Sequence, residues 1–160
     1  MNRKLISVLV SVMVIGIGGY FFAQQAFGNT GAMEKYLDDT YALTEDYFSL
    51  MDEEATVGDS EEALMVFSEE RLLPGLKEIL ERSEAIGETI GKEKLAEVHE
   101  LHNESLRLHI ASEEAWQSGE ETAFDLLMQS DEKYIEYEEK LEKLAGRWGV
   151  KLEWEDWEEQ

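Results

Sequence analysis

The chain has no cysteine, which excludes disulfides, thiolate metal sites, a cysteine nucleophile and a lipid-modified cysteine as a membrane anchor. Basic residues are also scarce, at 14 against 37 acidic residues, for a net charge of −23. Nucleic-acid binding needs a basic surface, so DNA and RNA are excluded as partners. The acids are spread over every predicted helix, and we attribute them to solubility in a saline or alkaline medium. Attraction of cations or of a basic partner is the alternative.

The known catalytic patterns are missing as well. The chain has no glycine-rich phosphate loop and no Gly-x-Ser-x-Gly. The zinc-protease pattern HExxH is absent, because His99 and His102 are three residues apart rather than four. The Glu-x-x-His motif of di-iron bundles does not occur either. We therefore expect a protein that is not an enzyme.

Residues 5–23 form a long apolar run without a charge or a proline. As a helix the run is about 28 Å long, close to the thickness of the hydrocarbon core of a bilayer. Arg3 and Lys4 precede the run and no basic residue follows until Lys35, a bias that keeps the N-terminus in the cytoplasm. The sequence therefore predicts a single-pass anchor, with the C-terminal domain outside the cytoplasm.

A cleaved secretory signal is the alternative to the anchor. Signals have a shorter apolar core and small residues before the cleavage site, whereas here Phe21 and Gln24 precede Ala23 and Ala26. Only cleavage near Gly28 approaches the pattern, and it would release the domain as a secreted protein. We favour the uncleaved anchor and divide the chain into the N-terminus with the anchor (1–28), a helical bundle (29–149) and an acidic, aromatic tail (150–160).

Four amphipathic segments follow the anchor. The apolar residues recur at helical spacing over 33–54, from a capping residue at Asp59 to about Ile90, over 92–117 and over 120–148. We expect Thr30 to cap the first helix, and Gly149 to end the last one with Val150 folded back toward Ala145. Short connections favour antiparallel neighbours, so the sequence predicts an all-α, up-down four-helix bundle. The alternation of Val150, Leu152 and Trp154 predicts an extended tail.

The second helix contains the only proline, Pro74. On an ideal helix, the apolar residues before and after Pro74 point in directions that differ by roughly 160°. Proline lacks a backbone donor and clashes with the preceding turn, so we expect a kink at Pro74, between Leu73 and Gly75, that brings both halves onto the core.

All three histidines lie on the third helix. His102 and His109 fall within some 20° of each other on its apolar face, Glu113 lies nearby, and His99 lies at the edge of this face. We interpret them as core histidines hydrogen-bonded to Tyr36, Tyr47, Tyr134 or Tyr137, or to a carboxylate. The alternative is a metal or haem site built on His109 with Glu113, or on His99 with His102.

The run Tyr137-EEEKLEKLAGRWGVKLE-Trp154, with the two helices that lead to it, resembles the C-terminal part of small, membrane-anchored helical proteins of Gram-positive bacteria. The resemblance implies an anchored helical fold and transfers no active-site residue. Many of those proteins carry a lipid-modified cysteine, so the anchoring of this chain would differ.

From these observations we expect a membrane-anchored, extracytoplasmic helical bundle with a non-catalytic binding or scaffolding role at the cell envelope. Its partners would be the membrane, through residues 5–23, and a protein of the envelope. It would need no cofactor. The alternative function is a metal- or haem-binding bundle that uses His99, His102, His109 and Glu113.

Overall fold

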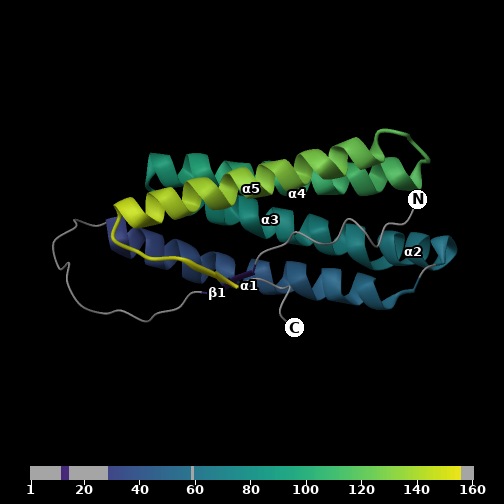
Figure 1. The fold of residues 1–160 in the computed structure, drawn as a ribbon, viewed down its shortest axis with the longest axis horizontal. Coiled ribbons are helices and arrows are strands. Elements are labelled where there is room, and N and C mark those ends of the chain that lie inside the picture. Colours follow the sequence, from purple (N-terminus) through teal and green to yellow (C-terminus); the bar gives the residue numbers. More distant parts are fainter. Residues whose placement is uncertain (1–11, 15–28, 59, 156–160) are drawn as a thin grey trace.

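The computed structural model describes residues 12–14, 29–58 and 60–155, with the side chains of 29–58 and 60–152. Its helices are α1 (Asn29–Thr56), α2 (Glu61–Phe67), the π-helix η2 (Ser68–Leu72), α3 (Leu73–Thr89), α4 (Glu93–Gln117) and α5 (Ala123–Arg147). Because α2, η2 and α3 follow one another without a break, the domain consists of four helical rods. They lie side by side and alternate in direction (Figure 1). The prediction of an all-α bundle of four helices is confirmed.

Turn chemistry explains most of the helix ends. Ser60, rather than the predicted Asp59, caps α2, because its hydroxyl accepts a hydrogen bond from the Ala63 amide. Gly149 has a φ of 79° after the end of α5, and the Val150 amide donates to the Ala145 carbonyl, as predicted. Thr30 does not cap α1. It lies inside the helix and donates to the carbonyl of Trp148 at 2.6 Å, which ties the start of α1 to the end of α5.

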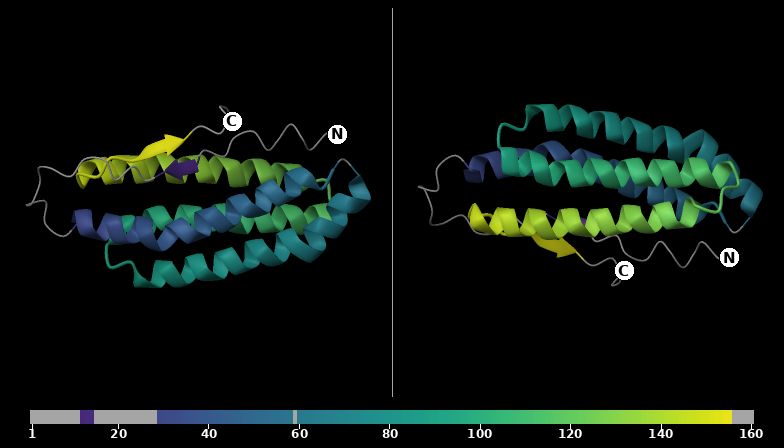
Figure 2. Two further views of the ribbon diagram at one scale, coloured as in Figure 1. Left: turned by 90° about the horizontal axis from the view of Figure 1, so that it is seen from below. Right: turned by 90° about the horizontal axis from the view of Figure 1, so that it is seen from above.

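The predicted kink at Pro74 is a π-helix that lies just before the proline. Pro74 occupies the first turn of α3, where its fixed φ is tolerated. In the preceding turn the Leu73 amide bonds to the Ser68 carbonyl, five residues back instead of four. This wider turn adds about one residue, or 100° of rotation, and so turns the following apolar residues toward the core. The rod curves here and is not broken (Figure 2).

A short ribbon accompanies the bundle. β1 (Val12–Val14) and β2 (Glu153–Glu155) pair antiparallel, with Met13 opposite Trp154. β2 extends the tail as predicted. Val12–Val14 differ from the predicted transmembrane helix, since β-branched residues in a short apolar run suit a strand as well as a helix. The rest of residues 5–23 lies outside the described residues. Among those described, no helix combines the length and the apolarity needed to cross a bilayer.

The core consists of two apolar clusters along the bundle axis. The first contains Met33 and Leu95 and extends to Trp148 and Leu152, and the second contains Leu50 and surrounds Leu72 and Leu106. Between the clusters, the residues of α1 and α4 that face the interior are polar. This central polar layer consists of Thr40, Ser83, His99, His102, Asn103, Ser105 and Ser130.

Candidate functional site

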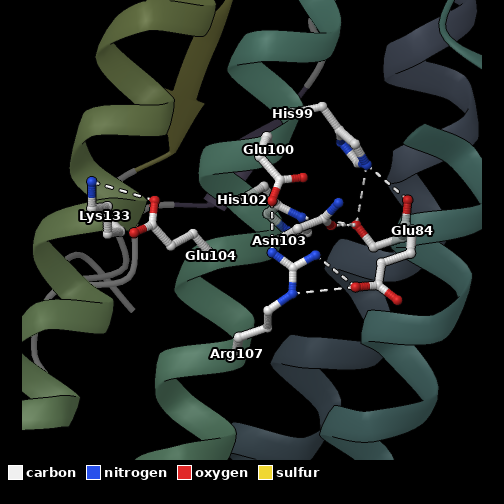
Figure 3. A network of polar contacts seen from close by, with 9 residues as sticks. Glu84, His99, Glu100, His102, Asn103, Glu104, Arg107 and Lys133 are labelled. Atoms are coloured by element: carbon white, nitrogen blue, oxygen red, sulfur yellow. Dashed lines mark hydrogen bonds and ion pairs between the residues drawn. The ribbon is translucent and has the colours of Figure 1, made fainter. Parts of the chain in front are cut away.

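The central polar layer gathers polar side chains from all four rods, and His99 is its most deeply buried histidine. Only 1 % of His99 is exposed, although its position on the helix predicts the edge of the apolar face. The α3 rod packs over this edge, and His99 points from α4 toward it (Figure 3). Its Nε2 lies 2.7 Å from the Ser83 carbonyl oxygen on α3. Gly87, one turn further along α3, leaves room for the imidazole, because a Cβ there would lie 3.1 Å from its Cδ2.

The carbonyl of Ser83 fixes the direction of a buried hydrogen-bond chain. A carbonyl can only accept, so Nε2 of His99 carries the proton and Nδ1 is an acceptor. Tyr36 Oη lies 3.1 Å from Nδ1 and therefore donates to it. Tyr137 Oη, at 3.0 Å from Tyr36 Oη, then donates to Tyr36. The chain thus crosses three helices, α5, α1 and α4, and ends on α3.

His102 is held in the same layer through Ser83. The Ser83 hydroxyl donates to Asn103 Oδ1 at 2.6 Å, which uses its only proton. His102 Nδ1, 3.1 Å from the same hydroxyl, must then be the donor. Burial, with a smaller contribution from His99, lowers the pKa of His102 to about 3, and burial also lowers the pKa of His99. Both imidazoles are neutral at pH 7.

Ion pairs on the surface flank this layer. The Arg107 guanidinium bridges Glu84 on α3 and Glu100 on α4, with N–O distances of 2.6 Å to each (Figure 3). On the other side, Lys133 of α5 pairs with Glu104 of α4 at 3.4 Å. These pairs clamp α4 to its two neighbours at the level of the histidines.

His109 and Glu113 lie about two and three turns beyond His102 on α4, near the second apolar cluster. His109 Nδ1 lies 3.2 Å from Tyr47 Oη on α1. Glu113, 3 % exposed, accepts a 2.6 Å hydrogen bond from the Ser68 hydroxyl on η2. Tyr47 and Ser68 thus reach these two residues from different rods, Tyr47 from α1 and Ser68 from η2.

The interpretation as core histidines hydrogen-bonded to tyrosine is confirmed for His99 and His109, whereas His102 bonds to Ser83, which was not among the predicted partners. Tyr36 bonds to His99 and Tyr47 bonds to His109, as predicted, while the ring of His102 packs against Tyr137 at a centroid distance of 5.1 Å. The sequence reasoning missed the other five members of the layer. For two of them, Ser83 and Asn103, a usable signal was present, because each lies four residues after a core position, namely Ile79 and His99.

The candidate metal ligands come together only in part. The rings of His99 and His102 stack at a centroid distance of 5.8 Å, so the structure brings this predicted pair together. Both nitrogens of His99 already have protein partners, Tyr36 and Ser83, which an ion would have to displace. Within the described part of the chain, no three His, Asp or Glu side chains are grouped so as to hold a metal ion.

Comparisons of the chain with protein-family models, curated proteins and solved structures give no match. The chemistry of the site must therefore be argued from its own geometry. No fully buried side-chain nitrogen or oxygen of the described polar layer lacks a hydrogen-bond partner. The layer holds four rods in register, as buried polar groups can when every member is paired.

A different feature faces solvent on α5. Phe124, Met128 and Ile135 are 40, 41 and 43 % exposed. They are spaced i, i+4 and i+11, which places them within about 40° of one another on a helix. We call these three residues the exposed stripe. Asp131 and Glu138 lie beside it, and burial raises the pKa of Asp131 to about 6 and that of Glu138 to about 7.

Proposed function

We propose that the protein is a membrane-anchored, extracytoplasmic helical bundle whose role is to bind a protein partner, without catalysis. The observation that carries the proposal is the exposed stripe of α5. Of the five large apolar side chains that are most exposed in the described domain, three belong to this one stripe. Apolar residues scattered singly over a surface need no explanation, whereas apolar residues aligned along one helix are typical of interaction sites.

The central polar layer supports a structural role for the histidines. His99 is buried and bonded at both nitrogens, so it offers no free lone pair to a substrate. A general base must be within reach of the group that it deprotonates, and the chain of Tyr137, Tyr36 and His99 ends on a backbone carbonyl. The layer therefore stabilises the packing of the four rods, and we place the binding site on the surface.

The anchor is proposed from residues 5–23. Inside a bilayer, backbone groups must be satisfied within the segment itself, so insertion would replace the pairing of Val12–Val14 with helical hydrogen bonds. The charge bias of Arg3 and Lys4 then leaves the bundle outside the cytoplasm. Because the chain has no cysteine, Glu97→Cys provides a single thiol on an exposed position of α4. We expect a membrane-impermeant maleimide to label it in intact cells; labelling only after lysis would refute this topology.

The binding role is tested by crosslinking. We would place a photo-crosslinking amino acid at position 128 of the full-length chain, and in the matched control at position 66, where Val66 is also exposed but lies on α2. We expect a discrete adduct from position 128 that is lost when Phe124→Ser is added. Equal adducts from both positions, or no adduct from either, would overturn the binding role.

A metal- or haem-binding bundle is the second candidate, because the rings of His99 and His102 lie together. The full-length chain, purified without chelator, would be compared with a His99→Ala/His102→Ala variant for bound metal and haem. A stoichiometric ion that is lost in the variant would favour this function. If both proteins contain the same substoichiometric amount of metal and haem, the metal- or haem-binding function is wrong.

A further inference from the structure

The exposed stripe lies beside the edge of α5 that approaches α1, because Asp131, next to the stripe on the helix, adds to the effect of burial in raising the pKa of Tyr47 on α1. The two helices run antiparallel, because Thr30 bonds to the carbonyl of Trp148 and Tyr36 bonds to Tyr137. Continuing this register places Tyr41 of α1 level with Ile135 of α5. Tyr41 is itself 47 % exposed, so α1 adds a fourth apolar side chain beside the stripe.

Among the described residues, the tail that follows α5 covers one end of this α1–α5 side. After α5 it turns back at Gly149, and Leu152 packs with Met33 and Trp148 in the first apolar cluster. β2 continues from there across the bundle between α5 and α1 (Figure 1). At the other end, Phe124 and Met128 keep about two fifths of their surface exposed.

The charges beside the stripe have one sign. Asp131 and Glu138 follow the stripe at i+3 from Met128 and from Ile135, and a fully buried oxygen of Glu138, Oε1, has no hydrogen-bond partner. The lysines of α5 lie on other sides of the helix, where carboxylates such as Glu104, Glu136 and Glu139 pair with them. These lysines are Lys133, Lys140 and Lys143. The stripe therefore combines apolar contacts with carboxylates that no lysine of α5 neutralises.

We propose that this side of the bundle, formed by Phe124, Met128 and Ile135 with Asp131 and Glu138, is a docking site for a basic amphipathic helix of a partner protein. The proposal rests on the binding role above and specifies the partner's chemistry. From Phe124 to Ile135 the stripe is about 16 Å long, which matches three turns of a docked helix. Such a helix would place its apolar residues on the stripe and its lysines or arginines beside the two carboxylates.

Charge also decides against a second copy of the chain as the occupant. The chain carries −23, and two copies that meet at the stripe would bring Asp131 and Glu138 toward their own counterparts. Like charges across an interface oppose association, whereas a basic helix gains from the same carboxylates. An anionic lipid surface is disfavoured for the same reason.

The test uses the full-length chain in phosphatidylcholine nanodiscs, with empty nanodiscs as the blank. The probe is a fluorescent 18-residue Leu/Lys peptide of helical amphipathic pattern. A Leu/Glu peptide of the same pattern and a scrambled Leu/Lys peptide serve as controls, and binding is followed by anisotropy in 0.15 M salt. We expect the amphipathic Leu/Lys peptide to bind at least tenfold more tightly than either control.

Variants then locate the site. We expect Phe124→Ser/Met128→Ser to weaken binding of the basic peptide at least tenfold, while Val66→Ser changes it less than twofold. Asp131→Asn/Glu138→Gln should weaken binding at least threefold, and the exposed control pair Glu81→Gln/Glu88→Gln less than twofold. Met128→Gln, a milder change at an exposed side chain, replaces the serine double variant if thermal melting shows that the latter is unfolded.

Two results would overturn the basic helix as the partner. One is that the three peptides bind equally tightly, or that Val66→Ser weakens binding of the basic peptide as much as Phe124→Ser/Met128→Ser does. The other is self-association of the chain that the Met128 variant abolishes, which would make the stripe an interface between copies. If the position-128 adduct persists in cells despite the first result, the binding role survives and only the partner's chemistry is wrong. If the adduct is missing while the basic peptide binds at the stripe, the stripe has the proposed chemistry but the binding role in cells is wrong.

Discussion

Replacing Tyr36 or Tyr137 with phenylalanine tests the direction of the buried hydrogen bonds that run from Tyr137 through Tyr36 to His99. The Ser83 carbonyl determines this direction, because it can only accept. In Tyr36→Phe the middle oxygen is lost, so His99 Nδ1 loses its donor and the Tyr137 hydroxyl loses its acceptor. Each buried group left unpaired costs about 1–3 kcal/mol, so we expect a loss of about 3 kcal/mol in the free energy of unfolding. Tyr137→Phe removes only the terminal donor and leaves the Tyr36–His99 bond intact. We expect it to cost about 1 kcal/mol.

The double variant Tyr36→Phe/Tyr137→Phe tests whether the hydrogen bonds of Tyr137, Tyr36 and His99 form one connected network or two independent contacts. Once Tyr36 is phenylalanine, the second substitution removes a hydroxyl that already lacks an acceptor, so its further cost should be close to zero or favourable. The measurement is urea unfolding of the full-length chain at pH 7, followed by circular dichroism at 222 nm, for the four proteins of the cycle. Additive losses would refute the coupling of the two contacts, and a larger loss for Tyr137→Phe than for Tyr36→Phe would refute the assigned direction.

Three further perturbations test other parts of the structure. The pKa of His102 is about 3 in the folded protein against an ordinary 6.5, so the unfolded chain takes up this proton first as the pH falls. Its contribution to stability is therefore complete above pH 6.5, decreases by roughly 2 kcal/mol at pH 5 and is lost as the pH approaches 3. His102→Gln should remove that part of the stability difference between pH 7 and pH 5; an unchanged difference would contradict the shift. Gly75→Ala would place a Cβ 2.6 Å from Leu50 Cδ1, and should cost about 1–3 kcal/mol by chemical unfolding. The matched Gly146→Ala, with nothing within 4 Å of its Cβ, should gain up to about 1 kcal/mol, and a loss of equal size in both would disprove the packing argument. Ser68→Ala removes the 2.6 Å hydrogen bond to the Glu113 carboxylate and should lower the melting temperature through a loss of about 2 kcal/mol, whereas an unchanged melting temperature would mean that this bond contributes nothing.

The sequence was sufficient for features that depend on local periodicity. The helices, the turn at Gly149 and the tyrosine partners of the histidines could be predicted because apolar spacing and glycine chemistry act over a few residues. His99 was placed at the edge of the apolar face because a helical wheel treats one helix alone. The α3 rod packs over that edge, and this contact cannot be predicted from the residues of α4 alone.

The π-helix and the polar layer were beyond local reasoning for different reasons. The apolar face changes direction around Pro74, which indicates that the helix departs from ideal geometry there. Either a kink at the proline or a wider turn at Ser68–Leu72 would bring both halves of the face onto the core. Helical spacing puts Ser83 and Asn103 in line with core positions, but it does not show their partners, because Ser83 meets His102 and Asn103 only when α3 packs on α4. The exposed stripe, in turn, is defined by what other elements leave uncovered, which only the tertiary structure reveals.

The hydrogen bond between Thr30 and Trp148 also determines how the domain would respond to mechanical load. It joins the first turn of α1 to the end of α5, so residues 29 and 152 are at the same end of the bundle. If the chain is pulled apart between these two points, the Thr30–Trp148 bond carries the load first and the Tyr36–Tyr137 pair next. The contacts between the two helices then break one after another, as in a zipper, so the bundle should open at a low force that varies little with pulling speed.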